Sequence, residues 1–137
     1  MTKASTTLQF FMLLSKSEAV ISRKLSGQGL GFGDLAVLYA IYRAPEGKIR
    51  RIDLAEAVGL TASGVTRLLV PLEKIGIIKR EAHERDGRVS YALLTRAGKE
   101  LLENSLSWTE MKCEELLPKN VAKNLDHASE LLKSLTI

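Results

Sequence analysis

Residues 52–75 read IDLAEAVGLTASGVTRLLVPLEKI. The first part, Ile52 to Val58, is long enough for about two helical turns. Gly59 permits the left-handed backbone conformation that commonly ends a helix. Thr61 can cap a second helix that runs to about Ile75. Two helices joined by a short turn with a glycine are typical of the helix-turn-helix motif.

The second of these helices has two different faces. Apolar side chains recur at helical spacing and predict one buried stripe. They are Val65, Leu68, Leu69, Leu72 and Ile75. The opposite face is small, polar and basic near the helix start, and it carries Ala62, Ser63, Thr66, Arg67 and Val70. Such a face can approach base edges and phosphates closely. Pro71 has no amide hydrogen to donate to Arg67, so we expect a bend in the later half of the helix.

A hairpin is predicted directly after the second helix. Strands are expected at 77–82 and 88–94, and apolar and polar side chains alternate in the latter. Asp86-Gly87 lies between them and favours a tight turn. A helix-turn-helix followed by a hairpin with a charged tip predicts a winged helix. The expected fold class is therefore mainly α with a small β-hairpin wing (α+β), and Lys48 to Arg50 can add a short strand.

Helices are also predicted on both sides of this region. They cover residues 7–25, 35–44 with Asp34 as its cap, a segment from the cap Thr95 to Pro118, and a last helix from Val121 to Leu135. The glycine-rich segment 27–33 is expected to be a flexible connector. The terminal apolar stripes exceed what one small winged helix can cover, which favours a helical dimer interface. The alternative is that they pack only within their own domain.

Composition places the chain among single-domain globular proteins. Its 137 residues suit about one domain, and 45% hydrophobic with 26% charged residues argues against disorder. The net charge is +4, and the segment 43–96 holds eleven Lys or Arg against seven Asp or Glu. All of the excess positive charge therefore lies in the middle of the chain. A basic segment on a neutral frame suits phosphate binding, although an ordinary solvated surface explains the charge equally well.

Several function classes are excluded or disfavoured. Cys113 is the single cysteine, which excludes an internal disulfide and a cysteine-built metal cluster, and acidic neighbours oppose a redox role. The two histidines, His83 and His127, are far apart, and the chain has no nucleotide-binding fingerprint, so we expect neither an enzyme nor a metal or other cofactor. The apolar runs are too short for a membrane span, and the start of the chain does not resemble a secretory signal. We therefore expect a cytoplasmic protein without a membrane partner.

Residues 54–98 read LAEAVGLTASGVTRLLVPLEKIGIIKREAHERDGRVSYALLTRAG. This sequence resembles the multiple antibiotic resistance regulator (MarR) family of winged-helix transcription regulators. The matching pieces are Leu54-Ala55, Val65-Thr66-Arg67-Leu68, Leu72-Glu73-Lys74-x-Gly76, Asp86-x-Arg88 and Leu94-Thr95-x-x-Gly98. The chain departs from the family pattern at Gly87, where a basic residue is common, and at Val70-Pro71, where an acidic and a basic residue are common. It also lacks the cysteine that some members carry in their first helix.

The resemblance implies a single domain over 1–137. Residues 1–30 and 99–137 would form a helical dimerisation region, and residues 34–98 a winged-helix DNA-binding region. It further implies a homodimeric, sequence-specific regulator, more often a repressor, that binds a pseudo-palindromic operator in double-stranded DNA. Many members release DNA when a small, often aromatic, effector binds between the two regions.

The candidate DNA-binding residues form three groups, each with a plain alternative. At the second helix they are Thr61, Ala62, Ser63, Thr66 and Arg67, and Arg67 can bond a guanine edge or a phosphate or else form a surface ion pair. At the wing, Arg85 and Arg88 suit a narrow minor groove, unless Glu84 or Asp86 holds them. Arg50 and Arg51 begin the first helix of the motif, and phosphate contact and an ordinary surface role are equally consistent with the sequence. A winged helix that serves as a protein-interaction scaffold and does not bind DNA is the alternative function.

Overall fold

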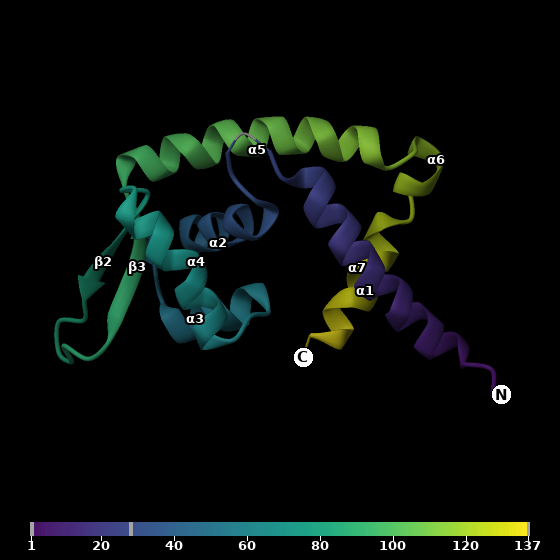
Figure 1. The fold of residues 1–137 in the computed structure, drawn as a ribbon, viewed down its shortest axis with the longest axis horizontal. Helices are drawn as coiled ribbons and strands as arrows, with labels where there is room; N and C mark the ends of the chain where they lie inside the picture. The colour runs from purple at the N-terminus through teal and green to yellow at the C-terminus, as the bar shows by residue number, and fades with distance from the viewer. Residues whose placement is uncertain (1, 28, 137) are drawn as a thin grey trace.

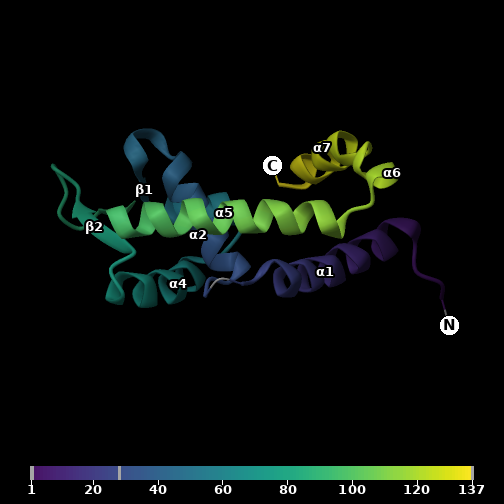
Figure 2. The ribbon, with the colours of Figure 1, turned by 90° about the horizontal axis from the view of Figure 1, so that it is seen from above.

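The computed structural model describes residues 2–27 and 29–136. Its elements are α1 (Thr6–Leu25), α2 (Phe32–Arg43), the short 3₁₀ helix η1 (Pro45–Gly47), β1 (Lys48–Arg50), α3 (Arg51–Val58), α4 (Ala62–Lys74), β2 (Ile78–Ala82), β3 (Ser90–Leu94), α5 (Arg96–Leu116), α6 (Lys119–Ala122) and α7 (Leu125–Leu135). The long helix α5 spans the molecule, with α3, α4 and the hairpin at one end and α1 and α7 at the other (Figure 1). Figure 2 shows the same arrangement from above. This order confirms the predicted winged helix with additional helices on both sides.

Hydroxyl side chains cap the helices that position the hairpin. The Thr61 hydroxyl accepts the N–H of Gly64 at 3.0 Å, and the Thr95 hydroxyl accepts the N–H of Gly98 at 3.0 Å. Gly59 ends α3 with a φ of 71°. All three predictions at these positions are confirmed. The helix-turn-helix therefore begins and ends where the local sequence favours it.

The start of α2 differs from the prediction. The helix begins at Phe32, whereas the sequence suggested a start at Leu35 after a cap at Asp34. The cap residue is Gly31, whose carbonyl accepts the N–H of Leu35 at 2.9 Å, and the Ser26 hydroxyl accepts the N–H of Phe32 at 3.1 Å. Asp34 instead lies in the first helical turn, where a carboxylate interacts favourably with the helix dipole.

The chain turns between α1 and α2, as expected for a connector, and the flexibility expected of it stays a prediction. Gly27 and Leu30 exchange two backbone hydrogen bonds of 3.1 and 2.9 Å, and the Leu30 side chain is buried. The Trp108 indole of α5 lies directly against Gly27, where an added Cβ would come within 2.5 Å of the ring. Gln28 lies outside the described residues, as do Met1 and Ile137 of the terminal regions. The turn is thus held by α5 as well as by its own backbone.

The three strands form one antiparallel sheet in the order β1-β3-β2. Ala92 of the central strand pairs with Ile49 on one side and with Arg80 on the other. Both hairpin strands are shorter than predicted, since Ile77 precedes β2, and Arg88 and Val89 precede β3. Val89 instead donates its N–H to the Asp86 carbonyl at 3.0 Å, so it belongs to the turn at the tip.

The hydrophobic core lies between α2, the helix-turn-helix, the sheet and the start of α5. Its fully buried side chains are Val37, Leu38, Ile41, Leu54, Val65, Ile78 and Leu102. The predicted stripe of α4 is buried at Val65, Leu69 and Leu72 and half-buried at Leu68, but Ile75 is 69% exposed. Ile75 departs from the stripe because α4 ends at Lys74, and Gly76 then turns the chain with a φ of 80°. Pro71 lies inside the continuous helix, and the bend expected there stays a prediction.

The terminal helices keep most of their apolar surface exposed. Among its described residues α7 has no buried side chain, and α1 has only Leu25. The expected last helix is in fact two helices, α6 and α7, separated at Lys123 and Asn124. Large exposed apolar side chains on α1 and α7 include Leu8, Phe11, Met12, Leu13, Ile21, Leu125, Leu131 and Leu135. No helix in the described ranges has the length and apolarity that a membrane crossing requires.

Candidate nucleic-acid interface

The start of α4 presents an open polar surface. Thr61, Ala62, Ser63 and Arg67 are all exposed there, as the sequence predicted. The Thr61 hydroxyl lies 3.3 Å from that of Ser63, while it caps the helix. The Arg67 guanidinium has no hydrogen bond or ion pair with any residue in the described ranges, so the predicted alternative of a surface ion pair is not seen. Its donors are available to a ligand.

Thr66 differs from its neighbours, because its hydroxyl is already engaged. It donates to the Ala62 carbonyl at 3.0 Å and accepts from Nη1 of Arg51 at 3.2 Å. Both Thr66 and Arg51 are half-buried. A hydroxyl has one hydrogen to donate, so in this geometry Thr66 cannot also donate to a phosphate or a base edge. The Thr66 hydroxyl therefore links α4 to the start of α3, and its predicted contact with DNA stays a prediction.

Arg50 and Arg51 begin α3 with different surroundings. Arg50 is exposed and its Nε donates to the Asp53 carboxylate at 2.9 Å. Arg51 contacts the Thr66 hydroxyl, and no carboxylate of the described residues pairs with it. The two neighbouring arginines thus differ in how far their charge is already neutralised.

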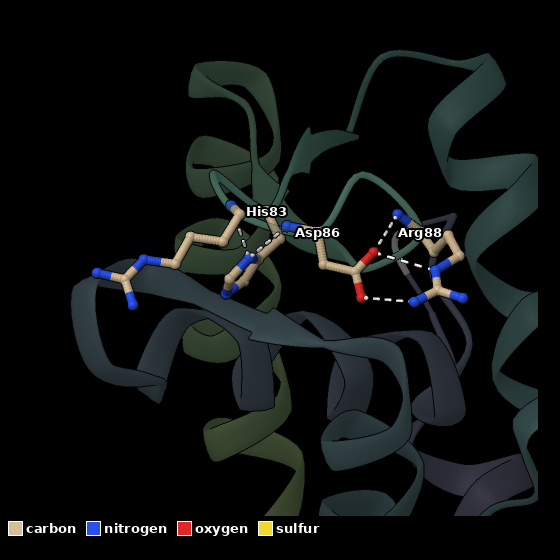
Figure 3. A network of polar contacts seen from close by, with 4 residues as sticks. His83, Asp86 and Arg88 are labelled. Carbon is tan, nitrogen blue, oxygen red and sulfur yellow. Dashed lines mark hydrogen bonds and ion pairs between the residues drawn. The ribbon is translucent and has the colours of Figure 1, made fainter.

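The wing tip is organised by two side chains that accept backbone N–H groups. Nδ1 of His83 accepts from the N–H of Arg85 at 3.1 Å and from that of Asp86 at 3.2 Å. The Asp86 carboxylate accepts from the N–H of Arg88 at 3.0 Å and from its Nε at 3.2 Å. Figure 3 shows these successive contacts along the turn. The turn is therefore preorganised by side-chain contacts on both sides of Gly87.

Both wing arginines remain accessible. The Arg88 side chain is 92% exposed in spite of its ion pair with Asp86, so the pair positions the guanidinium without covering it. Arg85 is exposed, and its contact with His83 is made by the backbone N–H, not by the side chain. The sequence offered a carboxylate partner as the alternative to an accessible Arg88. The structure confirms the partner, Asp86, and also shows that the Arg88 side chain remains accessible.

Two side-chain contacts of the hairpin join residues that are not neighbours in the sequence. His83 is half-buried and stacks on the Tyr91 ring at 5.7 Å between centroids. Nε of Arg80 lies 2.7 Å from the Glu73 carboxylate, which joins β2 to α4. The sequence predicts neither the His83–Tyr91 contact nor the Arg80–Glu73 ion pair, because each depends on how the hairpin folds against its neighbours.

Asp86 gives the wing a defined response to acid. The hydrogen bond from the Arg88 side chain, followed by that from its backbone N–H, lowers the pKa of Asp86 below its ordinary 3.8. A lowered folded-state pKa contributes stability above the unfolded pKa, and this contribution is lost as the pH falls through the folded value. We expect the Arg88 amide resonance in an NMR titration to change with a midpoint below pH 3.8. Asp86→Asn should abolish that change, and a wild-type midpoint at or above the ordinary value would contradict the assignment.

The remaining singled-out residues provide no second site. No cluster of three potential metal ligands occurs among the side chains that the structure describes. Cys113 is exposed on α5, and His127 is exposed on α7. Trp108 is half-buried and packs against Gly27. The exposed start of α4 and the arginine-bearing wing therefore form the candidate interface.

Part of the chain is similar in sequence to known transcription regulators. Residues 33–90 match the model of the MarR family. The chain is 29% identical over 99 residues to the HTH-type transcriptional repressor YetL of Bacillus subtilis, which covers 72% of this chain and 59% of YetL. It is 33% identical over 89 residues to the uncharacterized HTH-type transcriptional regulator YdgJ of the same organism, covering 65% of this chain and 53% of YdgJ. The match with both relatives thus spans between half and two thirds of their length.

The fold is also that of solved regulators. The MarR family transcriptional regulator Sco3205 from Streptomyces coelicolor, solved in complex with DNA, superposes with a TM-score of 0.74. The two share 20% sequence identity, and the match covers 97% of this chain and 90% of that chain. The structural likeness therefore extends well beyond residues 33–90 and includes the terminal helices.

Proposed function

We propose that this chain is a sequence-specific, DNA-binding transcription regulator of the MarR family that acts as a homodimer, because residues 33–90 match the model of that family. The observation that carries the proposal is the exposed face at the start of α4, with an unpaired Arg67, next to a wing whose two arginines remain accessible. The name of the relative YetL favours a repressor. Arg67 and Ser63 would contact the major groove, and Arg85 and Arg88 the adjacent minor groove.

The terminal helices support the dimer. A hollow of about 340 Å³ opens between α1 and α7, and its apolar lining includes Phe10, Phe11, Leu131 and Leu135. Apolar surface of this extent usually marks an interaction site. In the proposed assembly residues 1–30 and 99–137 form the dimerisation region, and residues 34–98 bind DNA. Two recognition helices related by a two-fold axis would read half-sites about 10 base pairs apart.

The proposal also places the protein in the cytoplasm and assigns it no catalytic activity.

We further propose that a small aromatic effector binds the protein and lowers its affinity for DNA. A thermal-shift screen with aromatic carboxylates and phenols, followed by competition against the bound operator, tests this part. A compound that stabilises the free protein and also releases DNA would support it.

The central test is DNA binding as a function of salt. Fluorescence anisotropy with the DNA sequence that co-purifies with the protein should show log K falling with log salt, by about 0.9 for each neutralised phosphate. Arg67→Ala should cost about 1–3 kcal/mol of specific affinity, because a bidentate base contact is lost. Arg96→Ala is the matched control, since it removes another exposed arginine, at the start of α5 and outside the candidate interface. Absence of binding, or a flat salt dependence, would favour the protein-interaction scaffold.

A further inference from the structure

Four arginine side chains surround one hollow between the start of α3 and the wing. The hollow has a volume of about 350 Å³, and its lining includes Arg50, Arg51, Arg80, Arg88, Val89 and Ser90. Three of the arginines have a carboxylate partner, at 2.9 Å for Arg50, 2.7 Å for Arg80 and 3.2 Å for Arg88. The partners are Asp53, Glu73 and Asp86, respectively. The hollow therefore contains one more cation than the described carboxylates balance.

The unbalanced cation is Arg51. It is half-buried, and its one hydrogen bond among the described residues is the 3.2 Å contact from Nη1 to the Thr66 hydroxyl. A guanidinium is always protonated and carries five N–H donors, so most of its donors have no protein acceptor here. Removing a charge partly from water without a counter-ion is unfavourable. An anion that entered the hollow would remove this penalty and use the free donors.

We propose that this hollow binds one phosphodiester group of the DNA backbone, and that Arg51 is the residue that recognises it. A guanidinium fork matches two oxygens of a phosphate group. The hollow lies between α3 and the wing, so a strand that contacts both α4 and the wing would pass it. This inference rests on the proposed function and deepens it, because it assigns a backbone contact to one particular cation.

The contact with Thr66 gives the phosphate site a second role. The Thr66 hydroxyl accepts from Arg51 and donates to the Ala62 carbonyl at 3.0 Å. Arg51, and through it the bound phosphate, is thereby connected by two hydrogen bonds to the first residue of α4, the helix that carries Ser63 and Arg67. Thr66 is therefore a positioning residue, which holds the Arg51 guanidinium in register with the recognition helix. Loss of Thr66 should weaken discrimination between operator and unrelated DNA, whereas loss of Arg51 should weaken binding to both.

Single neutral phosphates in the operator provide the test. A set of duplexes, each with one methylphosphonate, is titrated with the wild-type protein and with Arg51→Ala. We expect one position in each half-site where the modification weakens wild-type binding by about tenfold, as for loss of a charged hydrogen bond. Arg51→Ala should be insensitive to the modification at that same position. Its salt dependence should also be shallower by about 0.9 in slope for each half-site.

Three variants separate charge, geometry and folding. Arg96→Ala removes one positive charge elsewhere and should keep the wild-type methylphosphonate profile. Arg51→Lys keeps the charge without the fork and should retain the salt slope while losing part of the tenfold effect. Thr66→Val removes the acceptor of Arg51 with little change in shape and should reduce the ratio of operator to unrelated-DNA affinity. Thermal unfolding of each variant shows whether its fold is intact.

The outcomes distinguish the inference from the proposed function. If the wild-type protein does not bind duplex DNA, the proposed function itself is wrong. If it binds, but Arg51→Ala responds to every methylphosphonate as the wild type does, the phosphate site is wrong and the function stands. The inference would also be wrong if inorganic phosphate bound the free protein through Arg51 while Arg51→Ala kept the methylphosphonate profile of the wild type. The hollow would then bind a free anion and not the DNA backbone.

Discussion

Phe11→Glu is expected to turn the proposed dimer into a monomer that binds a two-half-site operator about 10²–10⁴-fold more weakly. Phe11 is 43% exposed on α1 and lines the apolar hollow between α1 and α7. A carboxylate placed in a buried interface loses its hydration without gaining a partner, which is strongly unfavourable. Linkage between the two DNA-binding regions would be lost, while each would remain folded.

Two measurements check this expectation. Analytical ultracentrifugation reports the oligomeric state, and anisotropy with full operator and with single half-site duplexes reports the affinity. Tyr42→Glu is the matched control, because Tyr42 is an aromatic residue of similar exposure, 51%, but it lies on α2 outside the terminal helices. It should remain a dimer. A wild-type protein that is monomeric at micromolar concentration, or a dimeric Phe11→Glu variant, would contradict the proposed interface.

Gly98→Ala should destabilise the fold by about 1–3 kcal/mol, with the upper end favoured by the rigidity of its neighbour. A Cβ at position 98 would collide with the backbone carbonyl oxygen of Ile77. This carbonyl cannot move away easily, because it accepts the N–H of Thr95 at 3.0 Å and contacts the Thr95 hydroxyl at 3.1 Å. The start of α5 would have to shift away from the hairpin.

Gly33→Ala is the control for this change, since Gly33 lies in α2 with no atom within 4 Å of the added Cβ. Alanine at such a helical position usually stabilises by about 0.4–1 kcal/mol. Urea unfolding followed by circular dichroism measures both variants. Equal stability of Gly98→Ala and the wild type would show that the close packing of α5 on Ile77 does not hold in solution.

Local signals predicted the helix-turn-helix well, because its determinants lie within a few residues of one another. Thr61 and Thr95 cap their helices through N–H groups three residues later, and Gly59 adopts the left-handed conformation that its position suggested. The stripe of Val65, Leu69 and Leu72 follows from helical periodicity alone. Such features depend on the chain's immediate neighbourhood, so the sequence contains them.

The deviations arise where a contact joins distant parts of the chain. The Ser26 hydroxyl accepts the N–H of Phe32, the first residue of α2, from six residues earlier in the chain. The Trp108 indole of α5 packs against the turn at Gly27. Periodicity could not show that α4 ends before Ile75. In the candidate site the sequence indicated the arginines correctly as a group. It could not show which of them have carboxylate partners, and this pairing is what distinguishes Arg51 from Arg50.

Trp108 is the only tryptophan of the chain, and its ring lies against the turn that joins α1 to α2. The protein thus contains an intrinsic fluorophore at the junction between its terminal helices and its winged helix. Nζ of Lys112 lies 5.7 Å from the ring centroid, so the emission spectrum is sensitive to the position of a nearby charge. A reorientation of the two regions on DNA or effector binding would change that emission, and it could be followed without any attached dye.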